Sequence, residues 1–196
     1  MIAALRRLRR DARGVTVIEF AIVAPVMVLL IMGLGELMYT VYAKSILDGA
    51  IQKAARDSAI QGGGDRANDI DARVMEQVHA MAPNATHISS RLSYNNFSSV
   101  KPERFTDGND NDRYDAGECF DDINGNSQWD ADPGMANQGG ASDVTKYRIT
   151  VTYPRPFPVA GLMGWDDTNT ITSETLLKNQ PWATQSRQIV VQKGSC

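Results

Sequence analysis

Apolar residues dominate the N-terminal part of the chain. Residues 20–35 form a run without a charged side chain, and apolar positions at helical spacing extend this run back to residue 15 and forward to residue 39. A helix of about 20 to 25 residues is long enough to cross a hydrocarbon core of about 30 Å. The pattern therefore predicts a transmembrane helix over residues 15–39.

Helical spacing continues beyond this run. Small and aliphatic residues recur on one face as far as residue 59, and charged or polar residues fill the other face. Three glycines at residues 62–64 then end the pattern. We therefore expect one helix over residues 15–61, whose second half is amphipathic and lies outside the membrane. A second helix is expected over residues 65–81.

Alternating polar and apolar residues predict strands in the C-terminal half. Residues 147–153 alternate most regularly, and further strands are expected over residues 89–94, 170–177 and 187–192. Helices followed by strands in this order predict an α+β domain over residues 65–196, in which a small antiparallel sheet packs on the long helix.

The segment before the apolar run is strongly basic. Residues 1–14 contain five arginines and one aspartate. Basic flanks stay on the cytoplasmic side of a membrane, so the pattern predicts a cytoplasmic N-terminus and an exported C-terminal domain. A secretory signal peptide has a shorter apolar core that ends at a cleavage site. Here the helical pattern continues, which favours a retained anchor over a signal peptide.

Glu19 stands at the front edge of the apolar run, where a carboxylate is costly in lipid. The segment Gly-Val-Thr-Val-Ile-Glu-Phe, which includes Gly14, Val15, Glu19 and Phe20, resembles the processing site of type IV prepilins. More specifically, the chain resembles the TadE-like minor pilins and pseudopilins of tight-adherence (Tad, or Flp) pilus systems. The similar stretches are residues 9–20, Ala24-Pro25, residues 33–37 and residues 50–59, with weaker similarity at residues 147–154, 171–176 and 179–181.

The resemblance implies that a prepilin peptidase cuts between Gly14 and Val15. Glycine suits the position before the cut because it has no side chain to obstruct the peptidase. Glu19 then becomes the fifth residue of the mature chain. Its carboxylate can pair with the new ammonium group of Val15 on a neighbouring subunit, which offsets the cost of both charges in an apolar setting. The alternative is a simple signal-anchor whose Glu19 lies in the headgroup layer.

The resemblance also implies a function and a location. The function is that of a minor pilin or pseudopilin that primes or caps a Tad-type pilus. The implied partners are the inner membrane, the prepilin peptidase and the major and minor pilins of the same system. The implied location is the bacterial inner membrane with a periplasmic C-terminal domain, or the extracellular pilus after assembly. The implied fold is a long helix that lies half in lipid and half on a pilin-like globular domain.

Composition narrows the classes of function. The net charge is −3, and loss of a leader with five arginines and one aspartate leaves −7. An acidic exported part argues against nucleic acid as a partner. The sequence contains no plausible Ser/His/Asp or Cys/His set, no phosphate-binding loop and no zinc-ligand spacing. We therefore expect a structural protein and not an enzyme.

The chain contains two cysteines, Cys119 and Cys196. Disulfides form and persist in oxidising compartments, so the predicted export favours a Cys119–Cys196 bridge over two free thiols. A bridge that closes so large a loop stabilises a domain by about 4 to 5 kcal/mol in the chain-entropy model.

Residues 103–133 form an acidic insert outside the stretches that resemble TadE-like proteins. Residues 103–132 contain ten acidic residues and two arginines, a local charge of −8. Within them, an Asp-x-Asn-x-Asn pattern followed by an aromatic residue and Asp-Ala begins at Asp107 and again at Asp122, 15 residues later. A solvated acidic loop is the alternative explanation, but it does not account for the same spacing twice.

The spacing is that of a calcium-binding loop, in which oxygens from positions 1, 3, 5, 7, 9 and 12 surround the ion. The first loop fills all six positions, the seventh through a backbone carbonyl, with Asp107, Asn109, Asn111, Arg113, Asp115 and Glu118. The second loop fills five, with Asp122, Asn124, Asn126, Gln128 and Asp130. We therefore expect structural Ca²⁺, with one complete loop and a second, less complete one.

The second loop lacks a ligand at its twelfth position, which is Pro133. Asp132 and Asp121 are the candidate substitutes, or else the second site is weaker. Position six, which is usually glycine in such loops, is Asp112 in the first loop and Ser127 in the second. Aspartate adopts left-handed backbone conformations more readily than most residues, so Ser127 is the larger departure.

Two other functions are compatible with the insert. A permanently anchored periplasmic or surface protein could use a calcium-ordered insert to bind a surface, peptide or glycan. An anchored hydrolase could use Asp/Glu pairs of the insert. The N-terminal resemblance favours the pilin-like function over both.

Overall fold

The computed structural model describes residues 15–60, 65–157, 161, 164–181 and 192–195. The chain divides into two compact units. The first comprises Met1–Tyr42 and Pro154–Asn169, and the second comprises Ala43–Tyr153 and Thr170–Cys196. The long N-terminal helix therefore contributes to both units.

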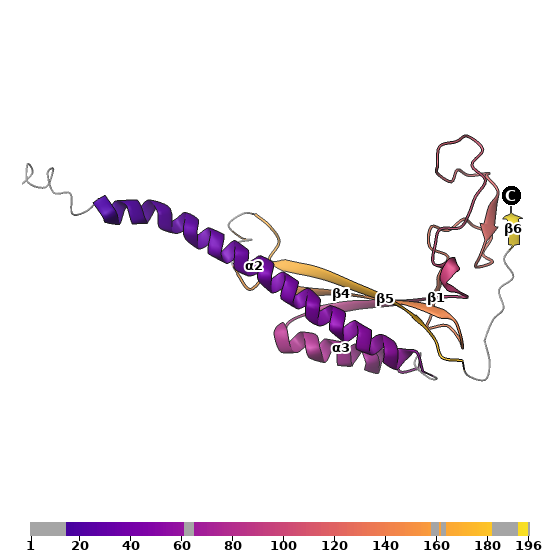
Figure 1. Cartoon of the computed structure of the whole chain (residues 1–196), viewed down its shortest axis with the longest axis horizontal. Coiled ribbons are helices and arrows are strands. Elements are labelled where there is room, and N and C mark those ends of the chain that lie inside the picture. The colour runs from indigo at the N-terminus through magenta and orange to yellow at the C-terminus, as the bar shows by residue number, and fades with distance from the viewer. Residues whose placement is uncertain (1–14, 61–64, 158–160, 162–163, 182–191, 196) are drawn as a thin grey trace, which may run out of the picture. The chain divides into compact units, whose positions relative to one another are not determined.

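This helix, α2, spans Val15–Ser58 and contains 44 residues (Figure 1). The predicted long N-terminal helix is thus confirmed, although it ends at Ser58 instead of residue 61. At that end the Ser58 hydroxyl donates to the Ala55 carbonyl at 2.8 Å, and the Ala59 amide donates to the carbonyls of both Ala55 and Arg56. Such shared hydrogen bonds are typical of a tightening last helical turn.

In the first unit most of the large apolar side chains of α2 are exposed, with Phe20 at 72%. Others that are more than half exposed are Val17, Ile18, Ile22, Val23, Val26, Met27, Val28, Leu30, Ile31, Leu34, Leu37, Met38, Val41 and Tyr42. By length and composition, α2 is long and apolar enough to cross a membrane. Apolar surface of this extent calls for a lipid or protein covering. The helix therefore supports the predicted membrane anchor.

The second unit is built on a four-stranded sheet with the strand order β3-β1-β4-β5. The strands are β1, Thr86–Tyr94; β3, Met135–Ala136; β4, Val144–Pro154; and β5, Thr168–Lys178. β1 is antiparallel to β4, and the register runs from Thr86 opposite Thr152 to Tyr94 opposite Val144. The predicted α+β class with a small antiparallel sheet is therefore confirmed.

The strand limits differ from those expected. β4 contains the strand expected over residues 147–153, and β5 contains the one expected over residues 170–177. β1 begins at Thr86, three residues earlier than expected. The prediction missed these three residues because all of them are exposed, so no alternation of polar and apolar residues marks them as a strand. The strand expected over residues 187–192 lies outside the described residues except for Gln192.

A second, two-stranded sheet joins β2, Phe120–Asp122, to β6, Gln192–Ser195. The two strands are antiparallel, with Phe120 opposite Ser195 and Asp122 opposite Gln192, and the register shifts between these pairs. The sheet links the acidic insert to the C-terminal end of the described chain.

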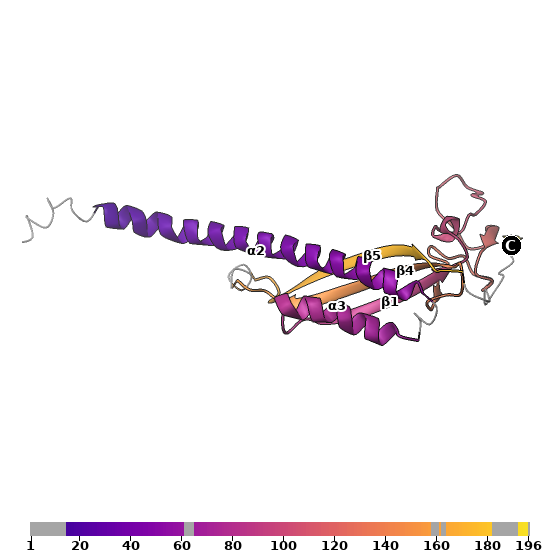
Figure 2. The ribbon, with the colours of Figure 1, turned by 60° about the horizontal axis from the view of Figure 1, so that its bottom comes forward.

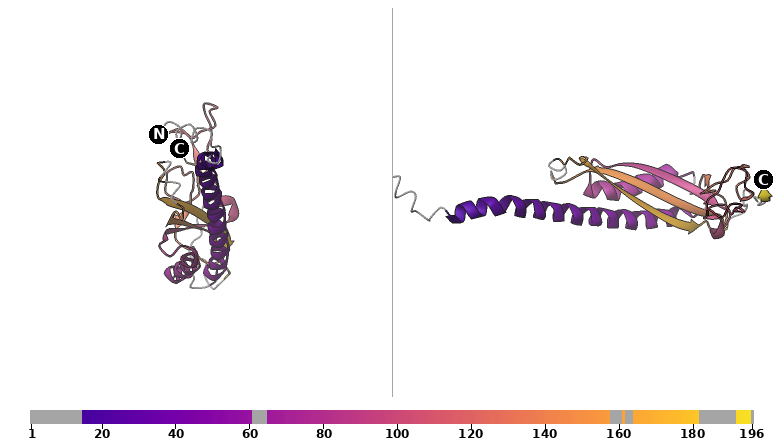
Figure 3. Two further views of the ribbon diagram at one scale, coloured as in Figure 1. Left: turned by 90° about the vertical axis from the view of Figure 1, so that its left-hand side faces the viewer. Right: turned by 90° about the horizontal axis from the view of Figure 1, so that it is seen from above.

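The second half of α2 and helix α3, Ala67–Met81, lie on one face of the four-stranded sheet (Figure 2). α3 lies behind the strands when they are seen from above (Figure 3). Large buried side chains from the second half of α2, from α3 and from β4 form the core: Leu47, Ile51, Val74, Val78, Tyr147, Ile149 and Val151. Burial of each such side chain contributes about 1.5 to 3 kcal/mol.

A buried ionic network joins α3 to the sheet. The Asp71 carboxylate pairs with Arg91 of β1 at 2.6 Å, and the two side chains are only 9% and 10% exposed. The hydroxyls of Ser89 and Tyr147 also donate to Asp71. Burial works against ionisation of Asp71, but the hydrogen bonds from Arg91 and the two hydroxyls outweigh it and hold the pKa of Asp71 below its usual value.

We expect Asp71→Asn to lower the free energy of unfolding by about 3 to 5 kcal/mol at neutral pH, because it leaves buried Arg91 without its counter-charge. The folded-state pKa of Asp71 lies below its unfolded value. Its stabilisation is therefore present above the unfolded pKa and is lost as the pH falls through the folded pKa. Denaturant titrations of the full chain in detergent micelles, across this acidic range, measure the difference between parent and variant.

Glu174→Gln is a matched control, because the ion pair between Glu174 and Arg148 is exposed. We expect it to cost less than about 1 kcal/mol. Equal losses from the two variants would contradict a special contribution from the buried pair.

Candidate functional site

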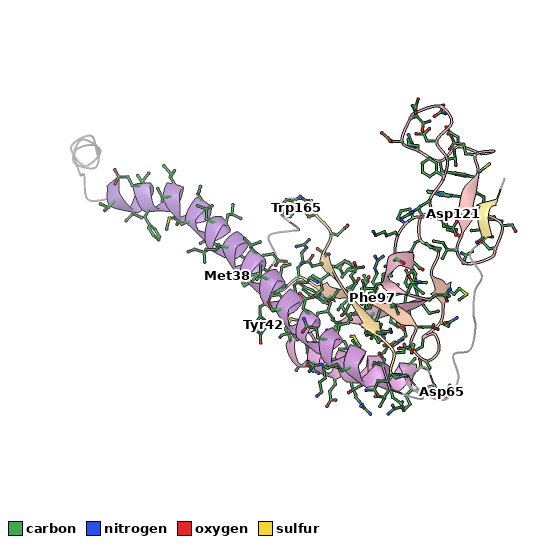
Figure 4. All side chains as sticks on the ribbon, turned by 45° about the vertical axis from the view of Figure 1, so that its right-hand side comes forward. Met38, Tyr42, Asp65, Phe97, Asp121 and Trp165 are labelled. Carbon is green, nitrogen blue, oxygen red and sulfur yellow. The ribbon has the colours of Figure 1, made fainter. Side chains whose placement is uncertain are left out.

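The acidic insert, residues 103–133, lies in the second unit, and Figure 4 shows its side chains beside the labelled Asp121. Its base is a short antiparallel pairing of backbone. The Thr106 amide donates to the Cys119 carbonyl at 2.8 Å, and the Asp121 amide donates to the Arg104 carbonyl at 2.8 Å. The first loop, residues 107–118, begins directly after Thr106 and ends directly before Cys119.

The first residue of each loop binds the loop backbone in the same way. Asp107 accepts hydrogen bonds from the amides four and five residues further on, at 3.3 and 2.7 Å. Asp122 accepts the equivalent two bonds in the second loop, at 3.3 and 2.9 Å. The sequence repeat is therefore also a structural repeat.

Positions three, five and nine converge in both loops. The side-chain amides of Asn109 and Asn111 donate to the same oxygen of Asp115, each at 2.7 Å. The asparagines at the equivalent positions of the second loop donate to one oxygen of Asp130, also at 2.7 Å. A half-turn of each amide exchanges its NH₂ group for its oxygen, so these side chains can present oxygens to a cation at the same place.

The seventh residues, Arg113 and Gln128, are held through their backbone. The Arg113 amide donates to the side-chain oxygen of Asn111 at 2.8 Å, and the Gln128 amide donates to that of Asn126 at 2.7 Å. These bonds fix the peptide at the position where a calcium loop contributes a carbonyl.

The backbone is left-handed at the fourth and sixth positions of both loops. The φ angles are 56° at Asp110 and 59° at Asp112 in the first loop, and 76° at Gly125 and 61° at Ser127 in the second. A left-handed conformation costs a non-glycine residue about 1 to 2 kcal/mol. Ser127 therefore adopts the conformation that glycine usually supplies at position six, at the expense of local strain.

Hydrogen bonds favour the ionised carboxylates of the first loop. Backbone amides, foremost that of Asp112, hold the pKa of Asp107 below its usual value. The side-chain amides of Asn109 and Asn111 likewise hold the pKa of Asp115 below its usual value. The carboxylates present oxygen atoms, the ligands that hard divalent cations prefer, and the two asparagines can add theirs after a half-turn of each side-chain amide.

No group of three or more His, Cys, Asp or Glu side chains arranged to hold a metal ion is found within the described residues. The three carboxylates that the spacing assigns to the first loop, Asp107, Asp115 and Glu118, therefore do not gather into such a group in this structure. An ion in either loop would also require asparagine and backbone oxygens. That mixed donor set fits Ca²⁺ better than a metal that prefers nitrogen or sulfur ligands.

Glu118, the twelfth residue of the first loop, turns back onto that loop. Its Oε1 accepts from the Gly108 amide at 2.8 Å, and its Oε2 accepts from the Asp115 amide at 3.0 Å. A carboxylate also reaches the second loop, but it belongs to Glu103, which was not among the ligands predicted from the sequence. Glu103 precedes both loops in the chain, so no spacing rule within a loop identifies it.

Asp132, one of the two candidate substitutes for the twelfth ligand, is engaged elsewhere. One of its oxygens accepts from the Tyr94 hydroxyl and the other from the Lys146 ammonium group. Asp121, the other candidate, pairs through its backbone with Arg104 at the base of the insert.

Four aromatic residues pack between the two loops. Tyr114 and Trp129, the eighth residues of their loops, stack with ring centroids 4.9 Å apart. Phe105 and Phe120 meet the Tyr114 ring edge-to-face at 5.9 and 5.8 Å. The cluster gives the insert a small apolar centre of its own.

The two cysteines flank the two-stranded sheet in the sequence. Cys119 immediately precedes β2, and Cys196, which follows β6, lies outside the described residues. The structure therefore describes the strands that adjoin the predicted bridge and not the bridge itself.

The N-terminal candidate site also falls partly outside the described residues. Gly14 is not described, α2 begins at Val15, and Glu19 and Phe20 are exposed in the first turns of the helix. The proposed processing position thus adjoins the start of a continuous helix.

In the first unit, Glu36 of α2 pairs with Arg155 at 2.9 Å, and the side chains are 15% and 20% exposed. Close by, the Phe157 ring lies where a Cβ atom at Gly35 would be 3.0 Å from it. The sequence did not indicate these contacts, because their partners are far apart in the chain.

Comparison with known protein families gives a match for the N-terminal segment. Residues 14–56 match the family model described as TadE-like protein. No curated protein and no solved structure gave a significant match to the chain. The matched segment covers nearly all of α2 and does not include the insert. The resemblance predicted from the sequence is thereby confirmed: residues 14–56 are TadE-like.

Proposed function

We propose that the chain is a minor pilin or pseudopilin that primes or caps a Tad-type pilus. The observation that carries the proposal is α2, a single helix of 44 residues that contains the TadE-like match and exposes its apolar side chains in the first unit. Lipid tails and the helices of other pilins can cover the same apolar surface. One helix can therefore serve first as a membrane anchor and later as a packing element of a fibre.

The proposal includes a defined topology and set of partners. The basic leader stays in the cytoplasm and the second unit is periplasmic, since basic flanks are retained on the cytoplasmic side. A prepilin peptidase removes residues 1–14, and the major and minor pilins of the same system then contact α2. The ammonium group of Val15 pairs with Glu19 of a neighbour, which offsets the burial of both charges.

Processing is tested by the intact mass of the protein purified from cells that carry a Tad prepilin peptidase. We expect the mass to lack residues 1–14. Gly14→Val places a branched side chain at the cleavage position, and we expect that variant to retain the leader. Gly33→Ala is the control, because a Cβ at Gly33 has no neighbour within 4 Å and leaves the cleavage position unchanged.

Retention of the leader in the unmutated protein would contradict processing. If the protein then also fractionates with membranes and never with sheared pili, the alternative gains support: a permanently anchored, calcium-dependent binding protein. Recovery of the shortened protein with sheared pili would support a place in the fibre.

We also propose that the insert binds structural Ca²⁺. Supporting this proposal are the repeated sequence, the repeated hydrogen bonds, and the left-handed backbone at positions four and six of both loops. Ca²⁺ would neutralise crowded carboxylates and offset the local backbone strain. Calcium outside the cytoplasm is plentiful enough for even sub-millimolar affinity to suffice.

We expect Ca²⁺ to raise the melting temperature of the full chain in detergent micelles. A ligand at about 100 times its dissociation constant stabilises a folded protein by about 2.7 kcal/mol for each site. The double variant Asp107→Ala with Glu118→Ala removes two ligands of the first loop, so its shift should be smaller. Asp65→Ala, an exposed carboxylate outside the insert, should keep the full shift. Absence of any shift in the unmutated protein would refute the calcium proposal.

A disulfide between Cys119 and Cys196 completes the proposal. Support comes from the antiparallel pairing of Phe120 with Ser195, since an antiparallel ladder continued by one residue in that register would bring the two cysteines opposite each other. Such a bridge would fasten the C-terminal strand to the insert.

We expect no free thiol in the exported protein. Treatment with iodoacetamide before reduction should leave the intact mass unchanged, and treatment after reduction should add two carbamidomethyl groups. Cys119→Ser should lower the free energy of unfolding by about 2 to 5 kcal/mol. Two carbamidomethyl groups on the unreduced protein would contradict the bridge.

A further inference from the structure

The Glu103 side chain is buried in the insert and is only 1% exposed. Its Oε1 accepts from the Ile123 amide at 2.7 Å, and its Oε2 accepts from the Asp130 amide at 2.9 Å. Its own backbone is held by the same loop, because its amide donates to the Asp130 carbonyl at 3.0 Å and its carbonyl accepts from Trp129 Nε1 at 2.8 Å. Two hydrogen bonds to the carboxylate and two to the backbone thus fix Glu103 against the second loop.

The two oxygens of Glu103 bind the second and ninth residues of the second loop. The two oxygens of Glu118 bind the second and ninth residues of the first loop, at 2.8 and 3.0 Å. The two glutamates therefore stand in the same relation to their loops, although Glu118 follows its loop and Glu103 precedes both. Pro133 occupies the twelfth position of the second loop in sequence, and Glu103 occupies it in space.

Charge gives an independent reason to expect a cation here. Asp122 is 0% exposed and Glu103 is 1% exposed, and both carboxylates contact the second loop. Neither forms an ion pair with a basic side chain in the part of the chain that the structure describes. Burial of a carboxylate costs several kcal/mol unless a positive charge offsets it. Backbone amides offset part of that cost, and a divalent cation would offset the rest.

We infer that Glu103 is the bidentate ligand of a second Ca²⁺ site, which is completed from two segments of the chain. This inference rests on the proposed calcium binding of the insert and adds one ligand to it. The second site then has as complete a set of ligands as the first, because Glu103 supplies the glutamate that the second loop itself lacks. The ion also joins the first residue of the insert to its second loop.

Calcium titration of the full chain in detergent micelles by isothermal calorimetry tests the inference. We expect two ions per chain for the unmutated protein. Glu103→Gln and its matched variant Glu118→Gln should each bind one ion, with affinity for the other lowered at least about tenfold. The double variant should bind none at the same concentrations.

The outcomes separate this inference from the proposal on which it rests. An unmutated protein that binds no Ca²⁺ refutes the proposed calcium binding itself. A Glu103→Gln variant that binds as many ions as the unmutated protein refutes the role of Glu103 alone. The one ion that Glu103→Gln retains, and that disappears on adding Glu118→Gln, shows that the insert still folds. Loss of both ions in Glu103→Gln also overturns the inference, because Glu103 would then support the whole insert and not one site.

Discussion

The apolar surface of α2 is the constraint on which the rest of the molecule depends. In the first unit its side chains are exposed, so this part of the helix is stable only where lipid or other apolar helices surround it. In the second unit the same helix has an apolar face, with Leu47 and Ile51 fully buried against the sheet. One helix therefore needs two different surroundings. A continuous helix with both kinds of surface is suited to a boundary between membrane and water.

The elements most visible in the sequence were those whose burial follows a regular period. The second half of the long helix and the strand β4 have such patterns, because one face of each is buried. The beginning of β1 has no such pattern, since Thr86, His87 and Ile88 are all exposed and only their pairing with β4 makes them a strand. Periodicity reports burial, and a strand fixed mainly by its backbone hydrogen bonds is therefore missed.

The candidate site shows the same limit at the level of single residues. The proposed ligands within each loop could be named from the sequence, because a calcium loop gathers them from one short segment. The proposed role of Glu103 could not be predicted in this way, because Glu103 reaches the second loop from another segment. The ion pair between Asp71 and Arg91 could not be predicted from the sequence for the same reason, because it depends on how α3 packs on the sheet. Spacing rules describe local geometry and give no information about which distant segment comes to lie beside it.

Asp71 and Glu103 present the same physical problem with different solutions. Both are buried carboxylates, and each binds several hydrogen-bond donors. Asp71 has Arg91 beside it, so its charge is balanced by the chain itself and the sheet is stable without any added ion. In the part of the chain that the structure describes, Glu103 and the nearby Asp122 accept hydrogen bonds from backbone amides and form no ion pair with a basic side chain. The core of the second unit therefore balances its buried charge within the chain, whereas under the proposed calcium binding the insert would take that balance from an added ion. Any response to calcium is then expected in the insert, which lies outside the TadE-like segment.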